Sequence, residues 1–104
     1  MKVTNVISPS SGCAVRNQFL IRDEENSIMY FQSYESVILK IDRANLWLTF
    51  GADWDYSATT RRWLYHVLRE ECCIGNDISN KIIQTAINSN GKIGRWNVSY
   101  SETL

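Results

Sequence analysis

The sequence predicts one α+β domain, in which a small antiparallel sheet of four to five strands carries two helices packed on one face. Two observations lead to this fold class. Short apolar runs alternate with turn-forming residues through the first half of the chain. Beyond Ser57, two stretches repeat apolar residues at helical spacing before a final strand-like run. At 104 residues, the chain is long enough for a single domain spanning 1–104 and too short for two.

The first three strands are expected at Val3–Ile7, Ala14–Arg22 and Ile28–Gln32. The polar stretch Ser8–Gly12 holds the only proline of the chain and predicts a loop between the first two strands. The acidic stretch Asp23–Ser27 predicts the turn of a hairpin between the second and third strands.

The next segment has a weaker pattern. Ser33 has the residue type of a helix cap, and the run Val37–Ile41 fits a buried helical turn or a strand equally well. The polar residues Asp42–Asn45 predict a turn. Leu46–Phe50 then predicts a strand of strong β-formers, which Gly51 ends.

An amphipathic helix is expected after Ser57, which has the residue type of an N-cap. Asp53 and Asp55, just before it, suit the positive end of the helix dipole. Apolar side chains fall on one face of this helix and charged side chains on the other. The apolar face holds Leu64, Val67, Leu68 and Cys72, with Trp63 at its border. Gly75 is expected to end the helix.

A second helix is expected between Asp77, as its cap, and the Asn90-Gly91 pair, as its C-terminal stop. Apolar residues recur between them at helical spacing. This stripe consists of Ile78, Ile82, Ile83, Ala86 and Ile87. The last strand is expected at Ile93–Ser99.

Composition narrows the class of protein. Hydrophobic residues make up 44% of the chain and charged residues 21%, which is typical of a folded domain. Eleven Lys and Arg residues balance eleven Asp and Glu residues, whereas a general nucleic-acid coat or a binder of anionic membranes shows a basic excess. No apolar run approaches the roughly 20 residues of a membrane span, and the first residues lack the apolar core of a signal peptide. We therefore expect a cytoplasmic protein with no membrane partner.

The three cysteines, Cys13, Cys72 and Cys73, are an odd set with an adjacent pair, which is a poor framework for disulfides. We expect reduced thiols that pack as small apolar groups. No CxxC motif or histidine cluster accompanies them, so neither a metal nor another cofactor is predicted. Most of the four tryptophans are expected in the core, because each buries a large apolar area.

His66, the only histidine, is a candidate for chemistry, because Glu70 lies one helical turn after it. Such a pair can supply a general base or half of a metal site. No serine-centred or cysteine-centred nucleophile motif accompanies the pair, so we expect an ordinary exposed helix face and no catalytic residues.

Asp53 and Asp55, together with Glu35, are a candidate carboxylate cluster for a divalent cation in a metal-dependent hydrolase. The favoured interpretation is structural. In it, Asp55 caps backbone amides or pairs with Arg61 or Arg62 at the start of the helix.

The acidic tip, which consists of Asp23, Glu24 and Glu25, is the first candidate for partner binding. It is either a solvated turn or a negative patch that meets a basic partner. The second candidate is the helix face of Arg62, Tyr65 and Arg69. Basic and aromatic side chains together fit nucleic acid or a protein interface, although adjacent glutamates are typical of an ordinary solvated helix.

Three blocks of sequence carry a recognisable pattern. They are Asn17-Gln18-Phe19-Leu20-Ile21, then Tyr30-Phe31-Gln32-Ser33-Tyr34 with Ser36 and Ile38, then Trp54-Asp55-Tyr56-Ser57-Ala58-Thr59-Thr60 with Leu64. In order and spacing, these blocks resemble a family of small uncharacterised proteins found on phages and mobile elements of Gram-positive bacteria. The segment from Cys72 onward departs from the short tails of that family, which makes it a candidate for an addition with its own role.

The resemblance implies a biological setting, that of small phage-borne proteins, and it supplies no catalytic residues. Small phage-borne proteins often inhibit bacterial defence proteins by binding them, as anti-CRISPR proteins do. We therefore expect a non-enzymatic inhibitor that blocks a host defence protein, such as a CRISPR effector, in the cytoplasm of the host bacterial cell. The alternatives are a small regulatory nucleic-acid-binding protein and, more weakly, the metal-dependent hydrolase. The aromatic content is also compatible with a homodimer.

Overall fold

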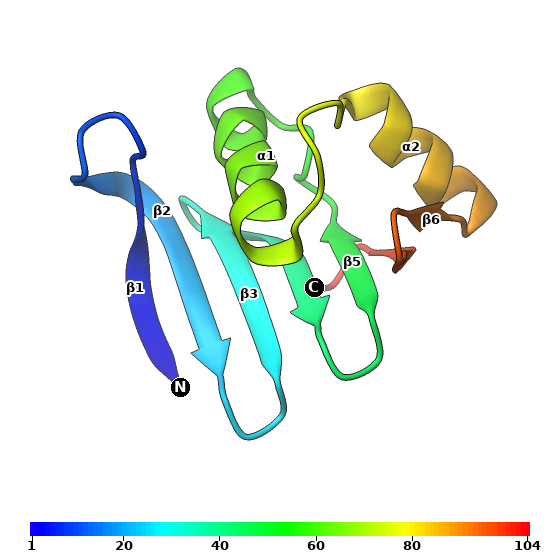
Figure 1. Cartoon of the computed structure of the whole chain (residues 1–104), viewed down its shortest axis with the longest axis horizontal. Helices are drawn as coiled ribbons and strands as arrows, with labels where there is room; N and C mark the ends of the chain where they lie inside the picture. The colour runs from blue at the N-terminus through cyan, green and yellow to red at the C-terminus, as the bar shows by residue number, and fades with distance from the viewer.

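The α+β class is confirmed by the computed structural model, which describes residues 1–104. A seven-stranded mixed sheet has the order β1-β2-β3-β4-β5-β7-β6, and two helices pack against it (Figure 1). The strands are β1 Lys2–Ile7, β2 Ala14–Asp23, β3 Ile28–Ser33, β4 Ser36–Asp42, β5 Trp47–Gly51, β6 Lys92–Ile93 and β7 Trp96–Ser101; the helices are α1 Ala58–Cys72 and α2 Asn80–Ser89. Neither helix is long and apolar enough to cross a membrane.

The first five strands form an antiparallel meander in which each strand pairs with the next. The run that periodicity left ambiguous is strand β4. Ser33 does not cap a helix, because it is the last residue of β3 and pairs directly with Ser36. Tyr34, between them, takes a left-handed backbone with φ of 56° and closes a tight hairpin.

The predicted four-to-five-stranded antiparallel sheet is wrong in strand number and in one pairing. After β5 the chain crosses over through both helices and returns as β7, which lies parallel to β5. Parallel neighbours need such a crossover. The predicted single strand at Ile93–Ser99 is a hairpin, because Gly94 takes a positive φ and turns β6 back onto β7.

Both helices contribute to one core on a single face of the sheet. The helix side chains Leu64, Leu68 and Ile83 are fully buried there with strand side chains such as Phe31 and Val98. Of the four tryptophans, three are buried as expected, and Trp47 is the exposed exception.

The segment after Cys72 is part of this core and not a separate addition. The Trp96 indole Nε1 donates a hydrogen bond of 3.0 Å to the carbonyl oxygen of Cys72. Ile93 and Val98 are buried in the same cluster as the meander strands. The last strands therefore complete the sheet.

The helix ends differ in part from the predictions. Ser57 caps α1 as expected, and Asn90 ends α2 in a left-handed conformation as expected. α1 stops before Gly75, because Cys73 takes the left-handed C-cap conformation and donates its backbone N–H to the carbonyl of Leu68. α2 is capped by Ser79, and not by Asp77, because the Ser79 side chain accepts from the backbone N–H of Ile82.

Candidate functional site: a hydroxyl-lined pocket at the start of helix α1

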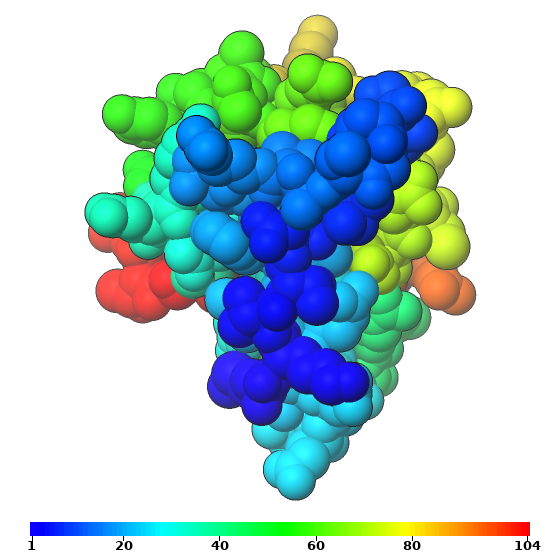
Figure 2. Space-filling view, turned by 90° about the vertical axis from the view of Figure 1, so that its left-hand side faces the viewer, coloured from blue at the N-terminus to red at the C-terminus, as the bar shows by residue number.

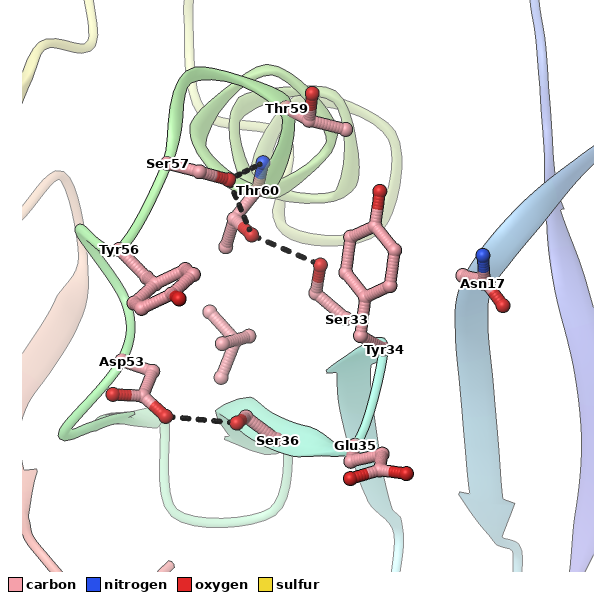
Figure 3. A pocket seen from close by; sticks show the side chains of 11 residues that line it. Asn17, Ser33, Tyr34, Glu35, Ser36, Asp53, Tyr56, Ser57, Thr59 and Thr60 are labelled. Atoms are coloured by element: carbon pink, nitrogen blue, oxygen red, sulfur yellow. Dashed lines mark hydrogen bonds between the residues drawn. The ribbon is translucent and has the colours of Figure 1, made fainter.

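A polar pocket of about 790 Å³ lies between the β3–β4 turn and the first turn of α1 (Figure 3). Its walls come from three separate parts of the chain, and most of the lining side chains carry hydroxyl or carboxylate groups. The lining residues are Asn17, Ser33, Tyr34, Glu35, Ser36, Ile38, Asp53, Tyr56, Ser57, Thr59 and Thr60.

The β3–β4 turn forms one wall. The backbone N–H of Tyr34 donates to the carbonyl of Asn17 at 2.7 Å, and the Gln32 side chain donates to the carbonyl of Tyr34 at 2.8 Å. These two bonds fix a turn whose own residues are exposed. The side chains of Tyr34 and Glu35 are therefore presented at the pocket from a rigid backbone.

The end of β5 forms the second wall, and Gly51 makes it possible. A Cβ at Gly51 would lie 2.4 Å from the carbonyl oxygen of Val37, so only glycine allows the two backbones to approach so closely. This approach brings Asp53 beside the start of β4, where its Oδ2 accepts a hydrogen bond of 2.8 Å from Ser36 Oγ.

A chain of hydroxyl groups links α1 to the sheet beneath the pocket. Ser57 Oγ accepts from the backbone N–H of Thr60 and donates to Thr60 Oγ1, both at 3.1 Å. Thr60 Oγ1 also lies 3.0 Å from Ser33 Oγ in a buried hydrogen bond. The cap of the helix is thus connected through the Thr60 hydroxyl to the last residue of β3 (Figure 3).

The charges that line the pocket are all negative. Glu35 and Asp53 contribute carboxylates, and no lysine or arginine lines the pocket. The positive end of the α1 dipole, equivalent to about half a charge, offsets only part of these two charges. Tyr34 and Tyr56 also line the pocket, with 51% and 79% of their surface exposed. Chemically, the pocket offers hydrogen-bond acceptors and aromatic rings to a cationic group.

Gln18 is a buried polar residue without a partner next to this pocket. It pairs with Ser33 across β2 and β3, and its side chain is completely buried. Neither its Oε1 nor its Nε2 has a hydrogen-bond partner. Burying an unpaired amide costs free energy, so the sheet beneath the pocket is not optimised for stability.

The acidic tip lies at the opposite end of β3. Asp23 accepts a hydrogen bond from Asn26 at 2.8 Å, while Glu24 and Glu25 point into solvent. The basic residues Lys2 and Arg22 line the same shallow hollow as these three acids. Their positive charges partly neutralise the predicted negative patch.

The helix-face residues Arg62, Tyr65 and Arg69 have different surroundings. Arg62 is exposed and its guanidinium stacks 4.8 Å from the ring centre of Trp63, whereas Arg69 is half-buried. The Tyr65 hydroxyl donates to Asn80 Oδ1 at the start of α2, and burial raises the pKa of Tyr65 above its ordinary value. Tyr65 therefore joins the two helices.

The candidate hydrolase residues are brought together only in part, because Glu35 and Asp53 line the pocket and Asp55 does not. Asp55 pairs with Arg61 at 3.0 Å, which confirms the structural interpretation, and it also accepts from Asn80 at 2.8 Å. Asp53 is bonded to Ser36. His66 packs edge-on against Trp63, with the ring centres 5.5 Å apart. No three side chains of the types that ligate metals gather anywhere in the chain.

The three thiols are free, and only one of them is buried. Burial raises the pKa of the Cys72 thiol to about 12, so this group stays protonated near neutral pH. Cys13 and Cys73 are exposed.

Sequence reasoning did not identify the pocket, although the signal was present in the three blocks of the recognised pattern. Asn17 comes from the first block, Ser33 and Tyr34 from the second, and Tyr56 and Ser57 from the third. These segments are far apart in the chain and meet only when β2, β3 and α1 assemble. Their convergence is the feature that singles out this site.

The fold and the pocket together define a class: a small α+β domain built on a β-meander, with an acidic, hydroxyl-lined pocket at a helix start. The chain belongs to a family of unknown function, DUF8033, whose model matches residues 1–85. The matched part contains the whole pocket and ends within α2. No curated protein and no solved structure matches the chain.

Proposed function

We propose that this chain is a non-enzymatic binding protein whose pocket receives an arginine or lysine side chain of a partner protein. The observation that carries the proposal is the composition of the pocket wall. Two carboxylates, Glu35 and Asp53, line it without a basic residue, and the exposed rings of Tyr34 and Tyr56 line it as well.

Arginine fits this arrangement best among the cationic side chains. Its planar guanidinium donates paired hydrogen bonds to carboxylates and stacks on aromatic faces. The serine and threonine hydroxyls can accept its remaining N–H groups. Tyrosine and arginine contacts also dominate the affinity of many protein interfaces.

The acidic tip and the Arg62/Tyr65/Arg69 face are secondary surfaces in this proposal. Lys2 and Arg22 reduce the attraction of the tip for a basic partner, and the Tyr65 hydroxyl is already bonded within the protein. No basic residue lines the pocket, so we place the main contact there.

We further propose that the partner is a bacterial defence protein with a basic nucleic-acid channel, such as a CRISPR effector, and that binding blocks the channel. The resemblance to proteins of phages and mobile elements supports this context, and we propose that the protein acts in the cytoplasm of the host cell. Acidic surfaces complement such channels and speed association with them.

The binding step is tested by NMR titration of the labelled chain with a Gly-Arg-Gly peptide. We expect amide shifts centred on residues 33–36 and 53–60, with a weaker response to Gly-Lys-Gly and none to Gly-Glu-Gly. The double variant Glu35→Gln/Asp53→Asn should lose the response, whereas Glu24→Gln/Glu25→Gln should keep it. Shifts centred on residues 23–27 instead would move the site to the tip.

The choice of partner is tested separately, by a plasmid-interference assay in bacteria that carry a CRISPR effector. Co-expression of the chain should protect the target plasmid, and the Glu35→Gln/Asp53→Asn variant should not. Loss of the plasmid in both cases, with peptide binding intact, would contradict the partner and leave the pocket in place.

A further inference from the structure

We propose that two copies of this chain pair through the free edge of β1 and form one continuous sheet. β1 is the first strand in the sheet order and has a strand neighbour on one side only. In an antiparallel ladder, alternate residues turn their N–H and C=O groups away from the partner strand. Half of the backbone groups of β1 therefore point outward. Figure 2 faces this edge and shows the blue N-terminal strand running down the front of the molecule.

The two edges of the sheet differ in their protection. The opposite edge, β6, has only two residues and lies against α2. Natural edge strands are usually shortened, charged, broken by proline or covered. In β1 the only charge is Lys2, at the first position, and Pro9 comes after the strand ends. The central part, Val3–Ile7, carries no charge. Its pairing with β2 shifts register between Asn5 and Ile7, and the extra residues lie in β2, between Ala14 and Phe19, and not in β1.

The sequence of β1 is self-complementary about Asn5. Val3 and Ile7 are 63% and 52% exposed, and they lie two residues before and two residues after Asn5, so the three side chains share one face of the strand. Antiparallel pairing centred on Asn5 places Val3 of each copy opposite Ile7 of the other. Residues directly opposite in a ladder share a face, so one two-fold operation brings both exposed aliphatic pairs into contact.

This register is more favourable than its neighbours. A shift of one residue moves every side chain of a strand to the other face relative to its partner, which would separate Val3 from Ile7 of the other copy. Because both copies use the same edge of β1, the contact is isologous and the assembly closes as a dimer. It involves neither the pocket nor the acidic tip, so it is independent of the proposed function.

The register is tested by single cysteines in a Cys13→Ser/Cys73→Ser background, which removes the exposed native thiols. Across a dimer centred on Asn5, the two residues at this position lie about 4.5–5.5 Å apart, within disulfide reach. Asn5→Cys should therefore cross-link under mild oxidation. Val3→Cys is the matched control, because its two copies would lie four residues apart, about 13 Å. Equal cross-linking of both variants, or of neither, would overturn the register.

The interaction itself is tested by sedimentation of the unmodified chain over about 10 µM to about 1 mM, because a short edge contact gives a modest affinity. We expect the mass to rise toward twice that of one chain. Val3→Lys/Ile7→Lys should remain monomeric and folded by circular dichroism. Ile82→Lys, at an exposed aliphatic residue of α2, should dimerise like the parent. A parent that stays monomeric throughout, or a double-lysine variant that still dimerises, would contradict the proposal.

Discussion

The two ends of β3 carry acidic turns of similar appearance in the sequence and of opposite character in the structure. At the Ile28 end, the acidic tip lies beside Lys2 and Arg22, and Glu71 bridges Arg22 and Arg43. At the Ser33 end, the acids line a pocket without bases, above a buried amide without a partner. The acids at one end have basic neighbours, whereas the other end keeps two carboxylates without bases and an amide without a partner. The comparison teaches that neighbouring charges, more than the number of acids, decide what an acidic turn can do.

The largest expected effect separates the two turns by charge reversal. In Glu35→Lys/Asp53→Lys, two new cations replace the carboxylates of the pocket and repel a basic partner. We expect affinity for the partner protein, once captured, to fall by about 100-fold, or about 2.7 kcal/mol. Glu24→Lys/Glu25→Lys at the tip should change affinity less than about threefold, because exposed rim charges contribute little. Calorimetric titration measures both variants, and a stronger loss at the tip would reverse the comparison.

The second prediction concerns the hydroxyl chain beneath the pocket. Thr60→Val keeps the side-chain shape but removes the bonds to Ser57 and Ser33 and leaves the Ser33 hydroxyl buried without this partner. The free energy of unfolding should fall by about 2 kcal/mol. Thr59→Val, at the exposed neighbour, should change it by less than about 0.5 kcal/mol. Urea unfolding monitored by tryptophan fluorescence checks both, and equal effects would show that the chain of hydroxyls does not connect α1 to the sheet.

The third prediction uses the buried amide. Gln18→Met replaces an unpaired polar group with an apolar one of similar size, so the free energy of unfolding should rise by about 1 kcal/mol. Gln32→Met is the matched control, because the Gln32 amide donates to the carbonyl of Tyr34, and its loss should destabilise slightly. Thermal unfolding measures both. A destabilised Gln18→Met variant would show that the amide is satisfied and that the pocket end of β3 carries no such cost.

The sequence was sufficient for the elements whose signals are local. Strands β1, β2, β3 and β5 and the Ser57 cap follow from alternation and residue type over a few positions, and the structure has them within a residue or two of the predictions. The run Val37–Ile41 fits a helical turn or a strand equally well in the sequence, and only the structure assigns it to β4. The parallel β7 could not be predicted in this way. Its place beside β5 depends on the length and packing of the crossover through both helices, which no short window contains.

The candidate site was harder to predict than the fold for the same reason. Glu35 and Asp53 lie on separate turns, and only the close approach at Gly51 brings the second turn beside the first. The acidic tip attracted attention because its three acids are consecutive. Part of the positive charge that offsets the acidic tip comes from Lys2, which the pairing of β1 with β2 places opposite Arg22. Site prediction from one sequence therefore gives too much weight to consecutive acids. It misses residues that lie far apart in the chain and that only the fold brings together.

The smallest expected effect tests whether the tip end of β3 is built for stability. Glu71 is the test residue, because its carboxylate accepts from Arg22 at 3.1 Å and from Arg43 at 3.0 Å, with its side chain 22% exposed. Glu71→Gln removes the charge from both pairs, and the free energy of unfolding should fall by about 1 kcal/mol, within the range for partly exposed ion pairs. The loss should shrink in about 0.5 M salt, because ions screen charges at this depth.

Glu70→Gln, one residue earlier and exposed, removes the same charge without breaking an ion pair and should leave stability almost unchanged. The difference between the two variants isolates the contribution of the bridge from that of net charge. If Glu70→Gln and Glu71→Gln destabilise equally, the bridge contributes nothing specific. The basic residues near the tip would then be free to meet a partner, and the tip would have to be reconsidered as a mixed-charge binding surface.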